Sequence, residues 1–457
     1  MEPKEYIAAL DLGSSKIIGM VGFKKQNAKL EVIAIEKVDS LTCIRRGTIH
    51  NLEETLLNAK QIINKLNNRI HPNKLTKVYV GVGGQSIHTV NHKAYRDLEQ
   101  EEFVNDDLIR SLIDECLEIT PNNAEVLEVI PNEYKLDSKK TEINPVGVAC
   151  TEIEGNFKLI VGRPSSKQII TRAIEEKSEI KVAELPISQM AAASLLLSDA
   201  DKVLGCALID FGAGTTSVSI YKDGLLRHLA VIPFGGNVVT KDICSANLME
   251  AEAEKLKKSF GSAILNPESD NKVFHPRGTG ALDDPKIDLH TLNNIIEGRM
   301  SEIIENVWSQ IEISGISKQL GAGIYYTGGA SQLRNVSDLI KRITGIEAKK
   351  AVNCREIINA SASNEAMQNP AYSVVLGLLA SGTMNCVKIA PQTITNAIPE
   401  PMFVEMAVQE IEKSKEKPVV PDKDKGKGIG GWKKKVVDKS NTLFGSMFEN
   451  NDDTEMK

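Results

Sequence analysis

Three short strings, widely separated in the chain, carry the residue types that bind the phosphates of a nucleotide. They run from Asp11 to Lys16 (DLGSSK), from Asp210 to Thr216 (DFGAGTT) and from Tyr326 to Ala330 (YTGGA). Glycines let backbone N–H groups approach phosphate oxygens because no Cβ is in the way, and the neighbouring hydroxyls add donors. The acid that opens each of the first two strings suits a hydrated Mg2+, which prefers oxygen ligands. Together the strings predict one clamp for Mg2+ and ATP.

The first two strings have the same local design. Each follows an apolar run, residues 6–10 or 203–209, and each returns to β-branched or aliphatic residues. This pattern predicts a strand, a tight glycine turn and a second strand, although one copy alone would equally fit an ordinary hairpin. Two copies indicate an internal duplication, in which each half brings one phosphate loop to a site between two domains. The third string suits contact with a flat base or ribose, and it also fits a plain strand-to-helix turn.

The composition fits a large cytosolic protein. Of the 457 residues, 41% are hydrophobic and 25% are charged, which is enough to bury at least two cores. The sequence predicts no transmembrane helix and no signal peptide. Seven cysteines lie scattered without a Cys-x-x-Cys pair, which favours buried thiols over disulfides or a zinc site. The net charge of -6 gives no reason to expect nucleic acid as the main partner.

Strand-like and helix-like segments alternate along the chain, which predicts mixed sheets flanked by helices. Helices are expected at residues 51–66, 106–119, 165–177 and 186–197, and a strand at 77–82. A long helix, or a pair of helices, is expected at 292–313, because its apolar residues form one stripe that suits core packing. The stripe consists of Ile295, Ile296, Met300, Ile303, Ile304, Val307 and Ile311.

From about Tyr6 to Met384 the chain resembles FtsA, the actin-like family of bacterial cell-division proteins. Beyond the three strings, the segments at 78–83 (VYVGVG), 129–134 (VIPNEY) and 144–147 (NPVG) resemble a subdomain that is inserted in this family and that MreB-type filament proteins lack. The segments at 232–242 and 295–303 resemble parts of the family's second small subdomain. The resemblance implies an α/β, actin-like two-domain fold of the actin/DnaK ATPase type with an inserted subdomain.

The resemblance also implies the domain boundaries. Domain 1 would have its core at 1–83 and 163–202, with part of 363–386, and the inserted subdomain would be 84–162. Domain 2 would have its core at 203–238 and 323–386, and the second small subdomain would be 239–322. In this family the second small subdomain binds the C-terminal tail of FtsZ.

Nucleotide roles follow from the resemblance position by position. Asp11 and Asp210 would hold Mg2+ through water. The phosphates would be held by Gly13, Ser14, Ser15, Lys16, Gly212, Ala213, Gly214, Thr215 and Thr216. The adenosine would be bound by Glu254, Lys257, Thr327, Gly328, Gly329 and Ala330. For Glu254 and Lys257, a solvated charged face is the alternative interpretation.

Three further residues are singled out. Ala213 stands where the family usually has a glycine, so the loop fits only if φ at Ala213 is negative. Gln189, in the helix expected at 186–197, is a candidate for positioning the water that attacks ATP. Arg299, in the long helix, matches an arginine of the family and is a candidate contact for the acidic FtsZ tail. An exposed arginine without such a role is the alternative.

The C-terminal part of the chain has a different composition. Residues 387–427, with prolines among Lys, Glu and Asp clusters, predict a flexible linker. Residues 428–449 predict an amphipathic helix that lies in a membrane interface, with lysines off the apolar face. The apolar face comprises Ile429, Trp432, Val436, Leu443, Phe444, Met447 and Phe448. Docking of this helix on a protein is the alternative.

These parts together predict an ATP-binding division protein that polymerises on the cytoplasmic face of the inner membrane at the division septum. The resemblance implies FtsZ, further copies of the chain, anionic lipids and later division proteins as partners, the last through the inserted subdomain. Hydrolysis is expected to be slow at most, with the nucleotide acting as an assembly switch. A PilM-type or MreB-like scaffold is the main alternative. A sugar or acetate kinase is disfavoured, because no substrate-binding constellation stands out among the histidines.

Overall fold

The computed structural model describes residues 5–24, 29–121, 123–265, 272–275, 286–351 and 368–388. All of them belong to one compact unit, which ends at Gln392. The helix predicted at 428–449 and nearly all of the predicted linker lie outside the described residues. The first two residues of the predicted linker instead form strand β20 (Val387–Lys388), which pairs with β6 (Lys74–Leu75).

The N-terminal half is built on a five-stranded sheet of order β12-β7-β1-β2-β3. Strands β1, β2 and β3 form antiparallel hairpins, whereas β7 joins β1, and β12 joins β7, in parallel. Parallel strands need a long crossover, so this half must contain helices that pack on the sheet. The strands are β1 (Tyr6–Leu12), β2 (Lys16–Lys24), β3 (Leu30–Asp39), β7 (Lys77–Val80) and β12 (Lys181–Val182).

The C-terminal half repeats the same topology. Its strands follow the order β15-β14-β13-β18-β19, again with two antiparallel hairpins followed by two parallel additions. They are β13 (Cys206–Phe211), β14 (Thr216–Lys222), β15 (Leu225–Ile232), β18 (Gly323–Thr327) and β19 (Ala348–Lys350). The shared order and directions confirm the internal duplication that the two phosphate strings predict.

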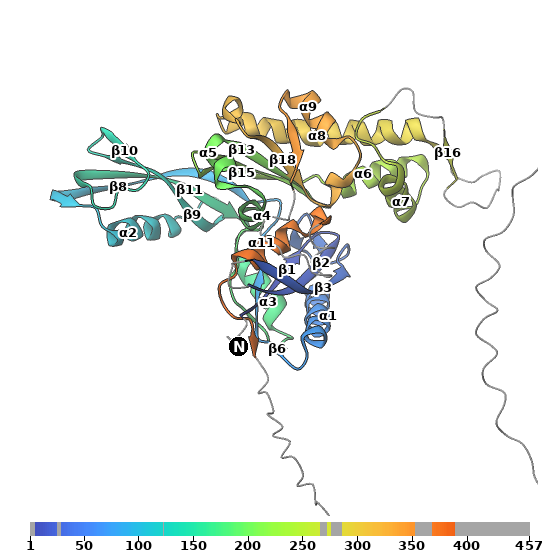
Figure 1. Ribbon diagram of the computed structural model, residues 1–457, viewed down its shortest axis with the longest axis horizontal. Helices are drawn as coiled ribbons and strands as arrows, with labels where there is room; N and C mark the ends of the chain where they lie inside the picture. Colours follow the sequence, from blue (N-terminus) through green and yellow to red (C-terminus); the bar gives the residue numbers. More distant parts are fainter. Residues whose placement is uncertain are drawn as a thin grey trace, which may run out of the picture. The chain divides into compact units, whose positions relative to one another are not determined.

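The inserted subdomain attaches to the sheet of the C-terminal half. It comprises β8 (His88–Phe103), α2 (Asp106–Leu117), β9 (Glu125–Leu136), β10 (Lys140–Glu142) and β11 (Ala149–Gly162). Strand β8 pairs antiparallel with β15 at His88 and Ala230, so the two sheets are continuous. Figure 1 shows the strands of the subdomain extending to one side of β15. The inserted subdomain therefore follows domain 1 along the chain, but its strands continue the sheet of domain 2.

The predicted helices of domain 1 are present, with small shifts at their ends. They are α1 (Leu52–Ile70), α3 (Ser166–Glu175) and α4 (Ser188–Leu196). The structure adds α5 (Asp199–Leu204) and α11 (Ser373–Ser381). Helix α1 begins at Leu52 because the side chain of Asn51 accepts a hydrogen bond from Glu54 N, at 3.2 Å. It continues one turn beyond the predicted end, because Ile70 extends its buried face.

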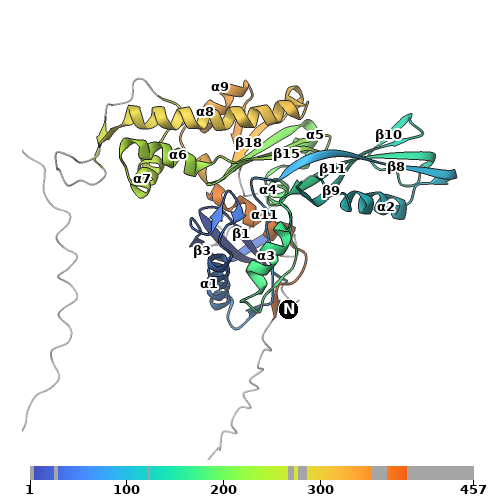
Figure 2. The same cartoon turned by 180° about the vertical axis from the view of Figure 1, so that it is seen from behind.

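Helices α4 and α11 cross each other between the two sheets, as the views from both sides show (Figure 1, Figure 2). Their backbones can approach closely because Gly377 has no side chain: a Cβ there would overlap the carbonyl of Ala191. This crossing connects the halves directly behind the nucleotide strings.

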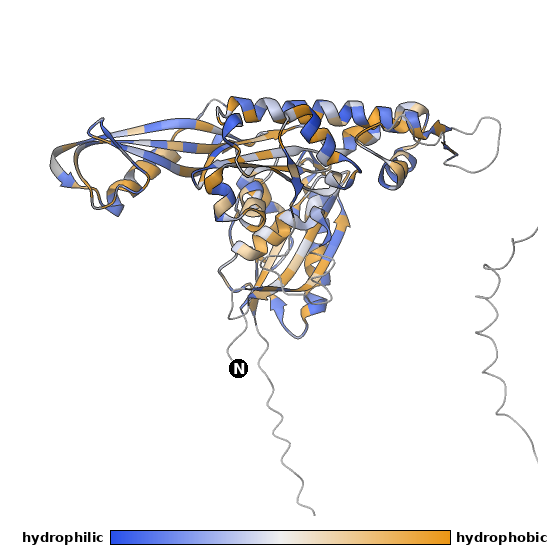
Figure 3. Cartoon of the chain, turned by 45° about the horizontal axis from the view of Figure 1, so that its top comes forward, coloured by the Kyte–Doolittle hydropathy of each residue, from blue (hydrophilic) through white to orange (hydrophobic). Residues whose placement is uncertain are grey.

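The second small subdomain is dominated by one continuous helix. Helix α8 (Leu289–Ile313) begins where the Asp288 side chain accepts a hydrogen bond from Thr291 N, at 2.7 Å. Its predicted apolar stripe is buried, with Ile295 only partly so. Figure 3 shows polar and apolar residues alternating along this long helix. The neighbouring elements are α6 (Gly236–Ile243), α7 (Glu250–Phe260), β16 (Val273–Phe274), β17 (Ile287–Asp288) and α9 (Val336–Thr344).

Within the described ranges, one apolar core spans the first sheet, α4, α11 and one face of β13–β15. A second lies between the other face of these strands and α8, and a third lies in the inserted subdomain. No helix in these ranges combines the length and apolar character that crossing a bilayer requires.

Candidate functional site

A cavity of about 870 Å³ is lined by residues from both halves. Its wall combines the two phosphate loops, the third glycine string and residues of α6 and α7. Of the residues predicted to bind nucleotide, the wall includes Asp11, Gly13, Ser14, Ser15, Lys16, Asp210, Gly212, Ala213, Gly214, Thr215, Glu254, Lys257, Gly328, Gly329 and Ala330. Strings that are far apart in the sequence thus meet at one site.

The two phosphate loops touch each other across the cavity. Each loop is the turn of a hairpin, β1–β2 or β13–β14, so the duplicated folds present them in the same way. A Cβ at Gly214 would clash with the side chain of Ser14, which shows how closely the loops approach. The hydroxyl of Ser14 is held in place by Gly47 N, at 2.7 Å. A phosphate chain bound here would contact both halves at once.

Asp11 and Asp210 are the last acidic groups before the two turns, and they interact electrostatically. Burial and the nearby charge of Asp210 raise the pKa of Asp11 to about 7. Burial raises the pKa of Asp210 to about 6. Two facing carboxylates in a poorly solvated place are costly unless a cation lies between them.

This pair fits a hydrated Mg2+ between the loops. Elsewhere in the described residues, no cluster of three or more His, Cys, Asp or Glu is arranged to hold a metal. Two carboxylates are enough for Mg2+, which keeps several of its waters and takes further oxygens from phosphate. Asp11 and Asp210 are therefore suited to bind such an ion through water, and their role in metal binding stays a prediction.

The third string contacts the second phosphate loop. Gly328 has φ of +93° and packs so closely that a side chain there would collide with the carboxylate of Asp210. Its neighbour Thr327 is fully buried behind the wall, where its hydroxyl pairs with Ser373 Oγ at 2.7 Å. Thr216 is also fully buried. Neither threonine is part of the cavity wall, so both support the loops from behind, which differs from the direct contact expected from sequence.

Glu254 and Lys257 form a buried network rather than a solvated charged face. Lys257 is only 7% exposed, and its Nζ lies 2.6 Å from Glu254 Oε2 and 2.8 Å from the carbonyl of Gly236. Desolvation acts to raise the pKa of Glu254. The charge of Lys257 and hydrogen bonds from Lys257, Thr240 and Lys258 outweigh it and lower that pKa to about 2. The network fixes α6 against α7 at the edge of the cavity.

Gln189 and Ala213 both line the cavity. In the described chain, Gln189 Oε1 is buried and has no hydrogen-bond partner, which suits an acceptor for a water near a bound phosphate. Ala213 is absent from the described residues with positive φ. Its Cβ is therefore tolerated, and the departure from glycine causes no backbone strain.

Sequence reasoning missed several wall residues, among them Lys37, Asp39 and Arg163. Lys37 and Asp39 belong to β3, which has no glycine string of its own. The available signal is alternation, because residues 16 and 18 of β2 and residues 37 and 39 of β3 point to the same side of the sheet. This signal can be used only when the pairing register of β2 and β3 is known, and the register cannot be read from the sequence.

Arg299 lies outside this cavity, on α8. Its Nε is 2.5 Å from Asp242 Oδ2, and its Nη1 pairs with Glu302. The guanidinium is about a quarter exposed. It is therefore a partly accessible arginine already engaged by two carboxylates, and a partner's acidic group would have to compete with them.

Comparison with known proteins is consistent with this architecture. The family model described as "Cell division protein FtsA" matches residues 207–377, and the one described as "SHS2 domain inserted in FTSA" matches residues 84–161. Among solved structures, a "PilM-PilN type IV pilus biogenesis complex" matches with a TM-score of 0.58 and 15% identity, covering 82% of this chain and 97% of that one. That likeness shows the actin-like fold alone.

Relatives of similar length are more informative. The chain is 36% identical over 340 residues to "Cell division protein FtsA" of Porphyromonas gingivalis, covering 74% of this chain and 71% of the relative. It is 25% identical over 388 residues to "Cell division protein FtsA" of Escherichia coli, covering 83% and 90%. Together with the actin-like halves, the inserted subdomain and the shared cavity, these matches show that the chain belongs to the FtsA family of cell-division proteins.

Proposed function

We propose that this protein binds Mg-ATP in the cavity between its halves and uses the nucleotide to control assembly into filaments that link FtsZ to the membrane. The meeting of the duplicated phosphate loops, with Asp11 and Asp210 between them, carries the proposal.

The chain's own residues suggest how such a switch works. Backbone N–H groups and hydroxyls of the two loops hold the phosphates, and Asp11 and Asp210 hold Mg2+ through water. The ion would neutralise phosphate charge. Because one loop belongs to each half, binding fixes the angle between the halves and so favours one conformation of the surfaces offered to neighbouring copies. Gln189, whose buried Oε1 has no hydrogen-bond partner in the described chain, is proposed to orient a water, and hydrolysis is proposed to be slow.

Asp210→Ala tests the nucleotide site. The substitution removes one of the two ion-binding carboxylates, so the affinity for Mg-ATP should fall by roughly a hundredfold or more. The fold should persist, because a costly buried charge has been removed. Fluorescent-nucleotide titration and thermal unfolding measure the two effects. Unchanged nucleotide affinity in a folded variant would remove the clamp assignment.

The link to FtsZ is proposed to run through the second small subdomain, residues 239–322. Arg299 is held there by Asp242 and Glu302, an arrangement that an acidic peptide can enter by replacing one carboxylate with another. The predicted tail helix at 428–449 supplies the membrane anchor. One such helix binds reversibly, whereas a filament presents many at once and gains avidity.

A single reconstitution tests this part. Anionic liposomes carrying the protein with Mg-ATP are incubated with a labelled FtsZ tail peptide, and a chain truncated after Pro421 is compared. Retention of the peptide only with the full-length chain is the expected result. Liposome binding without peptide retention would favour another actin-like scaffold, such as a PilM-type or MreB-like one. Failure of both would refute the anchor.

A further inference from the structure

The second phosphate loop is held by the start of α6. Gly212 O accepts a hydrogen bond from Gly236 N at 3.0 Å, and Ala213 O accepts one from Asn237 N at 2.8 Å. Gly236 and Asn237 open α6, and the first N–H groups of a helix have no acceptor within the helix itself. Two consecutive carbonyls of the loop therefore satisfy two donors that the helix leaves open.

These two bonds determine the direction in which the loop presents its own N–H groups. The peptide bonds of the loop are trans, so the C=O of one residue and the N–H of the next point to opposite sides. Because Gly212 O and Ala213 O are turned toward α6, the N–H groups of Ala213 and Gly214 point away from the helix. Neither N–H has an acceptor within the described chain. Consecutive N–H groups presented by a turn in this way suit an anion.

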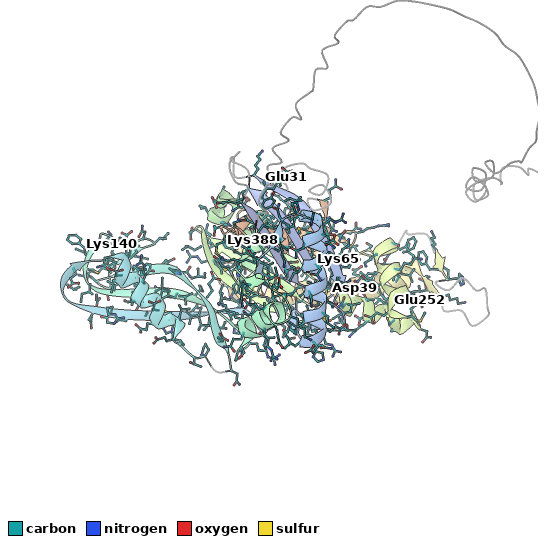
Figure 4. The ribbon with its side chains drawn as sticks, turned by 90° about the horizontal axis from the view of Figure 1, so that it is seen from below. Glu31, Asp39, Lys65, Lys140, Glu252 and Lys388 are labelled. Atoms are coloured by element: carbon teal, nitrogen blue, oxygen red, sulfur yellow. The ribbon has the colours of Figure 1, made fainter. Side chains whose placement is uncertain are left out.

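The start of α6 is in turn held by Lys257 of the neighbouring helix α7, on which Figure 4 labels Glu252. Lys257 Nζ lies 2.8 Å from Gly236 O, 2.6 Å from Thr240 Oγ1 and 2.6 Å from Glu254 Oε2. A lysine ammonium has three N–H donors, and these three acceptors match that number. Gly236 and Thr240 both belong to α6, so Lys257 joins the N-terminal part of α6 to α7.

The three contacts leave Lys257 no N–H donor for a ribose or a base. The cluster is also shielded from water, because Thr240 is 2% exposed and Lys257 is 7% exposed. Thr240 Oγ1 lies 2.5 Å from Glu254 Oε2 as well, so its hydroxyl contacts both members of the ion pair. A lysine held in this way acts on a bound nucleotide through the elements that it connects. This differs from the direct adenosine contact that the family resemblance implies.

We infer that Lys257 is a positioning residue for phosphate binding. From α7 it holds the start of α6, and α6 holds the second phosphate loop so that the N–H groups of Ala213 and Gly214 face a bound anion. The inference rests on the proposed nucleotide function and adds a role for α6 and α7 in it. ATP and ADP both carry phosphates that the loop can bind, so the affinity for each depends on Lys257. Adenosine lacks phosphate, so its affinity does not.

Lys257→Met tests the inference, because it keeps an unbranched side chain and removes all three bonds. Full-length protein with Mg2+ is titrated with ATP, ADP and adenosine. The dissociation constants for ATP and ADP should rise about tenfold, the loss typical of one charge-assisted hydrogen bond, and that for adenosine should stay the same. Amide hydrogen exchange of the nucleotide-free protein is the second readout. Exchange at Gly236 and Asn237 should accelerate by about tenfold or more, because the bonds from α6 to the loop open more often.

Lys255→Met is the matched control, since Lys255 is an exposed lysine of α7 that does not line the cavity. It should change neither readout. If Lys257→Met does not fold, Thr240→Val takes its place, because it removes one acceptor of Lys257 and keeps the shape of the side chain. Thr240→Ser keeps the hydroxyl and should bind ATP like the wild type.

Two results in a folded Lys257→Met variant would overturn the inference. One is wild-type affinity for ATP and ADP, or unchanged exchange at Gly236 and Asn237. The other is an equal loss of affinity for adenosine, because that pattern indicates direct contact between Lys257 and the nucleoside. If the wild-type chain binds neither ATP nor ADP, the proposed function itself fails, whereas the exchange measurement still tests the link from Lys257 to the loop.

Discussion

The buried carboxyl groups of Asp11 and Asp210 are expected to destabilise the folded protein when no nucleotide is bound. Burial raises the pKa of both carboxyl groups above the usual value, and the nearby charge of Asp210 raises that of Asp11 further. Between the usual value near 3.8 and about 7, the folded chain without nucleotide binds more protons than the unfolded chain. Its free energy of unfolding must therefore fall as pH rises through this range. A bound cation reverses the balance, because it favours the charged carboxylates.

Asp11→Asn should expose this cost. At pH 8 the variant lacks a destabilising buried charge. The free energy of unfolding of the nucleotide-free protein should therefore be larger by a few kcal/mol, and its unfolding temperature should rise. At pH 5 the wild-type carboxyl is protonated and resembles the amide, so the difference should nearly vanish. Mg-ATP binding should be severely weakened at both pH values.

Thermal unfolding at the two pH values, with and without Mg-ATP, measures these effects. The exposed Asp107→Asn on α2 is the control and should change neither quantity. A destabilised Asp11→Asn at pH 8 would contradict the electrostatic account of the pair.

At the scale of elements, the crossing of α4 and α11 depends on one glycine. A Cβ at Gly377 would overlap backbone atoms of Ala191, which cannot move away as a flexible side chain could. Gly377→Ala should therefore cost roughly 1–3 kcal/mol of stability, the usual range for overpacking, and weaken nucleotide binding by shifting the halves. Urea unfolding with tryptophan fluorescence measures the loss.

Gly298→Ala provides the matched control for Gly377→Ala. Gly298 also lies within a helix, α8, but a Cβ there would meet no atom within 4 Å. Its replacement should be neutral or stabilising by about 0.5–1 kcal/mol, the difference in helix propensity. Equal destabilisation by the two substitutions would show that close packing at Gly377 is not responsible.

Thr89 makes side-chain contacts across the junction between the inserted subdomain and domain 2, where Arg227 of β15 also pairs with Glu133 of β9 at 2.7 Å. Its hydroxyl accepts a hydrogen bond from Leu229 N at 3.0 Å, donates to Leu229 O at 3.3 Å, and lies 3.2 Å from His228 Nδ1. His228 in turn reaches Gln310 of α8 at 3.0 Å. This small set of contacts joins β8, β15 and the long helix.

Thr89→Val keeps the shape of the side chain and removes these bonds. Leu229 N would lose its partner, so amide hydrogen exchange at residues 228–230 should accelerate by about tenfold or more, while the cores of both halves stay protected. Thr141→Val, on the exposed strand β10, is the control. Unchanged exchange at Leu229 would show that the backbone pairing between β8 and β15 holds the subdomain by itself.

At the scale of the whole molecule, the proposed division role requires the compact unit and the tail to act together. Trp432→Glu places a charge on the predicted apolar face of the tail helix. Membrane affinity should fall by roughly tenfold or more, the value of burying one large apolar side chain, while Mg-ATP affinity stays the same. Liposome co-sedimentation and nucleotide titration on the same protein separate the two effects.

Val419→Glu makes a similar change in the predicted linker and is the control for Trp432→Glu. It should leave liposome binding intact. Persistent co-sedimentation of Trp432→Glu would place the anchor elsewhere. An equal loss of liposome binding in both variants would show that the added negative charge is responsible, and not the apolar face of a helix.

The sequence by itself determined the parts of this protein that are local. Glycine and hydroxyl residues after an apolar run predict a tight turn between two strands, and the repeat of that pattern predicted the duplicated halves, which share strand order in the structure. Periodicity also predicted α8 and its buried stripe, because the spacing of apolar residues on one face of a helix can be recognised within a few turns of sequence.

Only the tertiary structure decided what depends on contacts between distant segments. It showed that the inserted subdomain continues the sheet of domain 2 through β8 and β15, although the chain enters it from domain 1. It moved Thr216 and Thr327 behind the cavity wall, and it brought Lys37 into that wall through its pairing with Ile18. Such outcomes follow from strand register and burial, which are set by the packing of the whole unit and leave no local mark in the sequence.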